Sequence, residues 1–106
     1  MDIKYDIYIT ESAYKDLDNI YFYISDNLLE ETTATNIISE LKDTIFSLET
    51  MPGRFGLVSD SVLAKKGYRH INVKNYIILY LIDKKKTTVT IARIIHARID
   101  YSKIFN

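Results

Sequence analysis

The sequence contains no cysteine, one proline and three glycines in 106 residues. Without cysteine, the chain has no disulfide framework, no thiolate nucleophile and no cysteine-based zinc site. Long hydrophobic runs are also missing, because the longest, residues 76–82, is far shorter than a membrane span. The first residues begin no apolar run of signal-peptide length. We therefore expect a cytoplasmic protein without a membrane partner.

Composition and length indicate one folded domain. With 47% hydrophobic and 26% charged side chains, the chain is an ordinary globular sequence and not a disordered one. Its 106 residues suffice for one two-layer hydrophobic core and are too few for two. Pro52 and Gly53 separate an earlier part of the chain from a later part. We expect residues 1–106 to form a single domain.

Acidic and basic side chains concentrate in different halves of the chain, although the formal net charge is zero. Residues 1–61 carry four basic and twelve acidic side chains, a net charge of −8, and residues 62–106 carry ten basic and two acidic ones, a net charge of +8. Such a separation predicts a positive field over one region, which attracts phosphates or acidic protein segments. A simpler explanation, protection of sheet edges by lysines, suits Lys84, Lys85 and Lys86. It suits the arginines within or beside apolar runs less well: Arg69, Arg93 and Arg98.

Apolar residues in the first part recur with two different periods. Residues 3–9 alternate, which predicts a strand with one buried face, and Thr10 then offers a helix cap. Two stripes with steps of three and four residues follow. They predict two amphipathic helices that form an antiparallel hairpin joined near Asp26 and Asn27. The first stripe comprises Ala13, Leu17, Ile20, Tyr21, Ile24 and Leu28, and the second comprises Ala34, Ile37, Ile38, Leu41, Ile45 and Leu48.

Three runs rich in β-branched and aromatic residues follow, at residues 68–73, 76–82 and 88–96. The short links at residues 74–75 and 83–86 predict hairpin turns, with residues 76–82 as the central strand. This order predicts an α+β fold: an N-terminal strand, an antiparallel helical hairpin, and a three-stranded antiparallel meander in one sheet with the helices on one face. The helical layer is then acidic, and the positive field lies on the open side of the sheet or at its rim.

Three segments carry a family resemblance. Residues 10–17 (TESAYKDL) open the first helix, and residues 34–48 with Pro52 and Gly53 form the second helix and its exit. The most specific segment combines Arg69, the turn exit Asn75-Tyr76 and the ending HARIDY at residues 96–101. With these residues at these separations, nearly the whole chain resembles the RelE/ParE superfamily of type II toxin–antitoxin toxins, and is closer to its ParE-like branch.

The resemblance implies a small cytoplasmic toxin that inhibits growth and is held inactive by an antitoxin encoded beside it, in a system of the kind that stabilises plasmids. It also implies that the antitoxin brings the pair to promoter DNA. One branch of the superfamily cleaves messenger RNA on the ribosome. The other branch is similar in fold but poisons DNA gyrase without a recognised catalytic centre.

RNA cleavage by the adjacent 2′-hydroxyl requires a base, an acid and cations around the phosphate. His96 is a candidate base or acid, because an imidazole titrates near neutral pH. Arg69 and Arg98 are candidates for binding the phosphate through forked hydrogen bonds. Tyr101 is a candidate for stacking on a base or donating a proton. These four residues form the catalytic set that a ribonuclease would use.

The chain departs from the ribonuclease pattern in its central strand. Ile77 and Ile78 stand where that branch typically carries an arginine after Tyr76, and a net charge of zero gives little general attraction for ribosomal RNA. We therefore favour gyrase poisoning over ribosome-dependent cleavage. A degenerate toxin that only binds its antitoxin and an unrelated domain that binds nucleic acid remain alternatives. The candidates for target or antitoxin binding are Lys65, Lys66, Arg69, Lys74, Arg93 and Arg98.

Structural roles compete with these functional ones. Arg69 is a candidate for an ion pair with an acidic residue of the helical layer, and Arg98 for one with Asp100. His70 and His96 lack a third ligand at a sensible spacing, so we expect neither a metal nor a cofactor.

Overall fold

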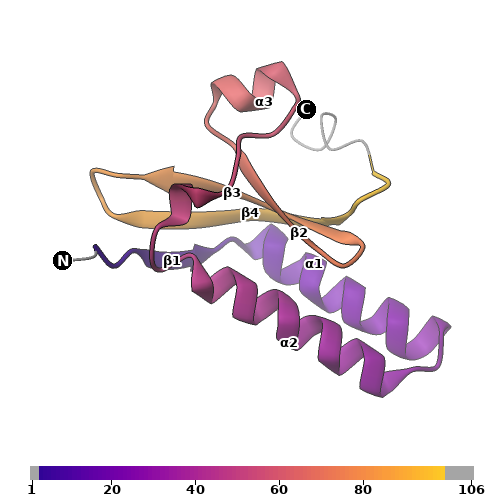
Figure 1. Ribbon diagram of the computed structural model, residues 1–106. Coiled ribbons are helices and arrows are strands. Elements are labelled where there is room, and N and C mark those ends of the chain that lie inside the picture. The colour runs from indigo at the N-terminus through magenta and orange to yellow at the C-terminus, as the bar shows by residue number, and fades with distance from the viewer. Residues whose placement is uncertain (1–2, 100–106) are drawn as a thin grey trace.

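The computed structural model describes residues 3–99 and places two long helices against one face of a four-stranded sheet (Figure 1). The helical layer comprises α1 (Glu11–Phe22), the π-helical turn η1 (Tyr23–Asn27) and α2 (Glu31–Ser47). The sheet comprises β1 (Asp6–Ile9), β2 (Arg69–Val73), β3 (Tyr76–Asp83) and β4 (Thr88–His96). The 3₁₀ turn η2 (Pro52–Arg54) and the short helix α3 (Ser61–Lys65) lie between α2 and β2. The α+β architecture predicted from the sequence is thus confirmed.

The strands follow the order β1-β4-β3-β2 across the sheet. β2, β3 and β4 form the predicted antiparallel meander, whereas β1 joins it parallel to β4. Both β3 and β4 are therefore interior strands. The turn that joins them carries Lys84, Lys85 and Lys86, so the suggestion that these lysines protect a sheet edge is wrong.

Thr10 attaches the start of α1 to β4. Its hydroxyl oxygen accepts a hydrogen bond from the amide of Ala13 and so caps the helix, as its position in the sequence predicts. The same hydroxyl donates toward the carbonyl oxygens of Ile91 at 2.9 Å and Ala92 at 3.0 Å. One side chain thereby satisfies a free amide of the first helical turn and fixes the helix against an interior strand.

The main core fills the space between the helical pair and the sheet. Burial of apolar side chains here supplies most of the free energy of folding, at about 25 cal/mol per Å² removed from water. One residue of the predicted stripes does not join this core: Leu28 is exposed, because it follows the π-helical turn and not a regular helix. The fully buried side chains of the main core include Tyr80, Leu41, Ile45, Leu48, Ile78, Ile91 and Val89.

The opposite face of the sheet carries a second, smaller core that the sequence did not predict. α3 covers part of this face (Figure 1), and the core comprises Val58, Leu63, Leu79 and Ile95. Asp60 caps α3 by accepting a hydrogen bond from the Leu63 amide at 2.9 Å. The side of the sheet that we expected to be open is therefore partly covered.

None of the helices within residues 3–99 has the length and apolar character to cross a membrane.

Candidate functional site

Arg69 is held by backbone carbonyls at the start of β2. Its guanidinium donates to the carbonyl oxygen of Phe55 at 2.6 Å and lies 3.4 Å from that of Gly53. The expectation that Arg69 pairs with an acid of the helical layer is wrong, because the ion pairs within residues 3–99 do not include Arg69 and its Nη1 atom bonds to these carbonyls instead. The neighbouring Tyr80 hydroxyl donates to the carbonyl of Pro52 at 2.6 Å. Arg69 and Tyr80 together fasten residues 52–55 to the sheet.

The pKa of Tyr80 is raised above the ordinary value of 10.0. Burial is the main cause, since it disfavours the charged phenolate. The cations Arg69 and Arg54 act in the opposite direction and lower this pKa, but the effect of burial is larger. Tyr80 is therefore a neutral hydrogen-bond donor at physiological pH.

Arg93 forms a bidentate ion pair with Asp16 that joins β4 to α1. The two hydrogen bonds are 2.7 Å and 2.9 Å long, and the same carboxylate accepts a third from the backbone amide of Ile94 at 2.9 Å. The hydrogen bond to Asp16 raises the pKa of Arg93. Because 29% of the Arg93 side chain and 11% of the Asp16 side chain are exposed, the pair is largely shielded from water. The guanidinium of Arg93, a predicted binding residue, is therefore bonded to a side chain of its own protein.

A β-bulge places Arg93 in this position. Leu79 faces Arg93 across the β3–β4 ladder and Tyr80 faces Ile91, so Ala92 is the extra residue of β4. As a result Ile91 and Ile94, three residues apart, both join the core on the helix side. The bulge lies beside the start of α1, where Thr10 and Asp16 both bond to β4.

A pocket of about 510 Å³ lies where the far ends of the helices approach the β2–β3 turn and the end of β4. Its floor and walls are mainly apolar, and Lys74 and His96 contribute polar groups from the sheet. The pocket is of the size and apolar character that small ligands or single side chains of a partner occupy. Its lining residues include Ile20, Tyr23, Leu28, Ile37, Tyr76, Ile94 and Ile99.

His96 stands at the end of β4 beside Tyr76. The two rings meet edge to face with their centroids 5.5 Å apart, and the Nδ1 atom of His96 accepts a hydrogen bond from the backbone amide of Arg98 at 3.1 Å. Burial raises the pKa of Tyr76, and the nearby Tyr23 adds to this shift. Arg98 itself is exposed. His96, Arg98 and Lys74 therefore cluster at one end of the sheet.

Arg69 lies away from this cluster. It pairs with Tyr80 in the middle of β3, whereas His96 pairs with Tyr76 at the start of that strand. Tyr76 and Tyr80 are four positions apart, a distance of about 13 Å along the strand. The other candidates are also dispersed: Lys65 and Lys66 are exposed at the end of α3, on the face opposite the long helices. Tyr101 and Asp100 lie outside the described residues.

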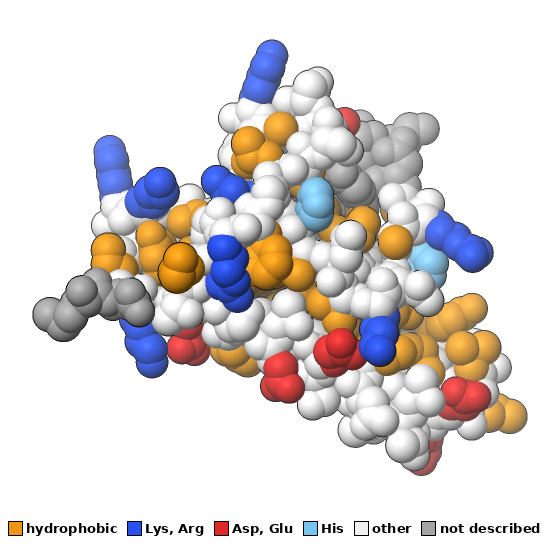
Figure 2. Space-filling view, viewed as in Figure 1, with side chains coloured by type: hydrophobic (Ala, Val, Ile, Leu, Met, Phe, Trp, Pro, Cys, Tyr) orange, Lys and Arg blue, Asp and Glu red, His pale blue; other side chains and the backbone are white. Residues whose placement is uncertain are grey.

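A surface that the sequence predictions overlooked is the end of the helical hairpin, residues 22–31, called here the hairpin tip. It exposes the large side chains of Phe22, Tyr23, Leu28 and Leu29. In Figure 2 hydrophobic side chains gather over this end of the molecule, with acidic side chains beside them. The signal in the sequence was the group of adjacent apolar residues at 22–23 and 28–29, which two single helical stripes cannot all bury.

Within residues 3–99, no group of three acidic, histidine or cysteine residues is placed to hold a metal ion.

Comparison with known proteins gives a consistent result. Residues 7–101 match the model of the family described as ParE toxin of the type II toxin–antitoxin system parDE. Solved structures that share the fold include two toxin–antitoxin systems. One is the toxin–antitoxin complex RelBE2 from Mycobacterium tuberculosis, with 24% sequence identity, a TM-score of 0.66, and coverage of 89% of this chain and 92% of that one. The other is the chromosomal ParDE system from P. aeruginosa, with 16% identity, a TM-score of 0.73, and coverage of 90% and 98%. No curated protein sequence matches the chain.

Proposed function

This chain belongs to the ParE toxin family of type II toxin–antitoxin systems, and from that membership we propose that it stops growth by poisoning DNA gyrase in the cytoplasm until a cognate antitoxin neutralises it. The family match covers residues 7–101 and so includes every described strand and long helix except the first residue of β1. Both structural neighbours are toxin–antitoxin systems, which supports an antitoxin as the partner.

The observation that carries the choice of gyrase is the dispersal of the cations that RNA cleavage requires. Arg69 bonds to the carbonyl of Phe55 and faces Tyr80, four positions along β3 from the residue that His96 faces. Arg93 is bonded to Asp16. A ribonuclease that uses the 2′-hydroxyl needs its acid, base and phosphate-binding cations within hydrogen-bond reach of one phosphate. This dispersal favours a toxin that acts through binding.

Ribosome-dependent cleavage of messenger RNA is the second candidate, and one observation favours it. His96, Lys74 and Arg98 lie together at the end of the sheet beside the pocket. A proton-transferring imidazole next to two cations is a reasonable part of a nucleolytic site. A protein that has lost toxicity and only binds its antitoxin is a third possibility with the same surface.

For the antitoxin, the exposed basic surface is the proposed contact. Lys65, Lys66, Lys74 and Arg98 are exposed, whereas Arg69 and Arg93 already bond within the chain. An acidic segment of the antitoxin complements Lys74 and Arg98 at the end of the sheet, and apolar side chains of that segment fit the pocket that Lys74 helps to line. Lys65 and Lys66, at the end of α3, contact a further part of an antitoxin that wraps around the toxin. Through such a complex the toxin is carried to promoter DNA that the antitoxin binds.

Expression of the toxin without its antitoxin tests the choice of target in cells. We expect growth arrest with induction of a DNA-damage reporter while amino-acid incorporation continues at first. Early loss of amino-acid incorporation with messages cut at the ribosomal A site, and a silent reporter, would instead support the ribonuclease. Unchanged growth would support the degenerate binding module.

A further inference from the structure

We propose that the hairpin tip is the surface through which the toxin contacts its target, and that it fits a positively charged protein surface with an apolar cleft. The inference rests on the proposed function, because it names where on this chain the poisoned enzyme binds. It assigns the target to the part of the tip that carries Phe22 and Leu29, and leaves to the antitoxin the basic end of the sheet and the pocket, which Tyr23 and Leu28 also line.

The first argument is the apolar exposure of the tip. Leu29 is 84% exposed, and Phe22, Tyr23 and Leu28 are each more than half exposed. All four lie within eight consecutive residues at the end of the helical layer. Isolated exposed apolar side chains are common on protein surfaces, but a group of large ones in one place usually marks an interaction site.

The backbone of the tip holds these side chains outward. α1 ends in the π-helical turn Tyr23–Asn27, and the amide of Glu30 donates back to the carbonyl of Ile24 at 3.3 Å. Leu29 adopts a φ of 54°, in the left-handed region that favours glycine. A glycine here would avoid the strain, yet the chain carries a large apolar residue that is almost completely exposed. This position therefore presents a side chain at an energetic cost to the fold.

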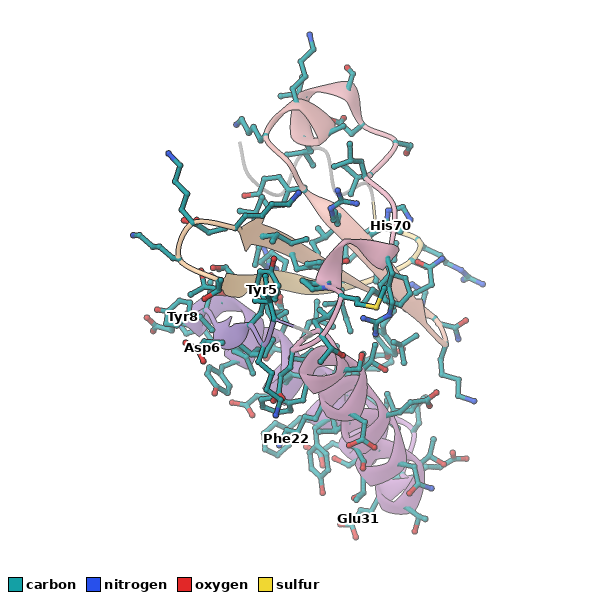
Figure 3. The ribbon with its side chains drawn as sticks, turned by 60° about the vertical axis from the view of Figure 1, so that its left-hand side comes forward. Tyr5, Asp6, Tyr8, Phe22, Glu31 and His70 are labelled. Carbon is teal, nitrogen blue, oxygen red and sulfur yellow. The ribbon has the colours of Figure 1, made fainter. Side chains whose placement is uncertain are left out.

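The second argument is the charge around the tip. Residues 16–41 contain six acidic side chains and neither lysine nor arginine. Asp16 is paired with Arg93, but the ion pairs of residues 3–99 include none of Asp18, Asp26, Glu30 and Glu31. Figure 3 shows Glu31 at the far end of the helical layer, away from His70 on the sheet. The tip thus combines unpaired negative charge with exposed apolar area, and Lys74 borders it across the pocket that Tyr23 and Leu28 help to line.

The charge of the hairpin tip indicates which class of molecule binds it. RNA and DNA carry the same sign as the tip and are repelled by it. An acidic antitoxin segment is likewise disfavoured here and matches the basic surface described above. A protein surface that normally binds DNA is cationic, and an apolar cleft in it would bury Leu29 and Phe22. Gyrase, which must hold DNA to cut it, offers a surface of this class.

The test compares two exposed residues with the same strained backbone. Leu29→Gly removes the apolar side chain at the tip and relieves the left-handed conformation, so the fold is retained. Met51→Gly is the matched control, because Met51 is 68% exposed, has a φ of 47° and lies beyond the opposite end of α2. That helix has 17 residues, which separates the two positions by roughly 25 Å.

Each variant is assayed with purified gyrase and supercoiled plasmid, and its affinity for the cognate antitoxin is measured in parallel. We expect Leu29→Gly to lower the amount of cleaved plasmid at a fixed toxin concentration by about tenfold, which corresponds to a loss of about 1.4 kcal/mol in binding. Its antitoxin affinity and Tm should stay close to those of the wild type. Met51→Gly should match the wild type in all three measurements. A Glu30→Lys, Glu31→Lys double variant should also lose plasmid cleavage, because its charge then repels a cationic surface.

Two results would overturn the inference: full plasmid cleavage by Leu29→Gly, or a loss of antitoxin affinity as large as its loss of cleavage. If the wild-type toxin itself yields no cleaved plasmid, the proposed function fails and growth arrest in cells becomes the readout. In that case loss of arrest by Leu29→Gly alone still supports a target contact at the tip. Arrest by both glycine variants refutes it.

Discussion

Arg69 and Tyr80 face each other across β2 and β3, and both donate hydrogen bonds to carbonyls of one short loop. Arg69 reaches Phe55 and Tyr80 reaches Pro52, each at 2.6 Å. This arrangement explains why an arginine that resembles a functional residue in the sequence is in part a structural one. It fixes the exit of α2 against the sheet and leaves the other end of the sheet to carry the exposed cations.

The Tyr80 hydroxyl should therefore contribute to stability. Tyr80→Phe leaves the buried carbonyl of Pro52 without its donor, and we expect it to lower the free energy of unfolding by about 1–3 kcal/mol. Urea denaturation at pH 7 measures the loss. The control is Tyr14→Phe, since Tyr14 is exposed and its change should be close to zero. Equal stability of the two variants would contradict this role.

Tyr80 also predicts how stability depends on alkaline pH. Burial raises the pKa of Tyr80 above 10.0, so near that pH the phenol ionises in the unfolded chain but not in the folded one. The contribution of Tyr80 is fully present below about pH 10 and is lost as the pH rises through its folded-state pKa. Urea denaturation from about pH 8 to pH 11 should show a steeper decline for the wild type than for Tyr80→Phe. Parallel curves would contradict the raised pKa.

The Asp16–Arg93 pair predicts a larger loss. Asp16→Asn removes the charge that compensates a largely shielded guanidinium, and we expect the free energy of unfolding to fall by about 2–3 kcal/mol. Asp18→Asn, a change of the same chemistry two residues away on the exposed face of α1, serves as the control. Thermal denaturation of both variants provides the comparison. A Tm for Asp16→Asn equal to that of Asp18→Asn would show that the pair does not stabilise the fold.

Antitoxin binding should depend on the cations at the end of the sheet. Lys74→Ala with Arg98→Ala should weaken the affinity for the cognate antitoxin by about tenfold at low salt, and by less as salt screens the charges. Lys42→Ala, on the acidic helical layer, should leave the affinity unchanged. Titration calorimetry at several salt concentrations measures the effect. A flat salt response of the wild type would exclude an electrostatic contact.

Local patterns in the sequence were sufficient for most of the fold. The period-two runs and short links located the meander, and residues 88–96 coincide with β4. Contacts between distant segments were not predictable from those patterns. Arg93 and Asp16 are 77 residues apart, and they meet because α1 packs against β4 beside the bulge at Ala92. The short helix α3 was not predicted either, because its five residues are too few to show a helical period in the sequence.

The candidate site was predicted less completely than the fold. Charge alone could not distinguish Arg93, which bonds to Asp16, from Arg98, which is exposed, because the difference depends on tertiary packing. Leu28 fits the first helical stripe, but the stripe assumes a regular α-helix. The π-helical turn at Tyr23–Asn27 interrupts that helix, so Leu28 is exposed and does not join the core. The sequence therefore did not predict the hairpin tip as an exposed apolar surface.

The most direct test of the proposed target is a titration of purified toxin into gyrase and supercoiled plasmid, beside a parallel titration into a translating ribosome system. We predict cleaved plasmid in proportion to the toxin, its disappearance when the cognate antitoxin is added, and intact messages on the ribosomes. Messages cut at the ribosomal A site together with undamaged plasmid would contradict the assignment to gyrase.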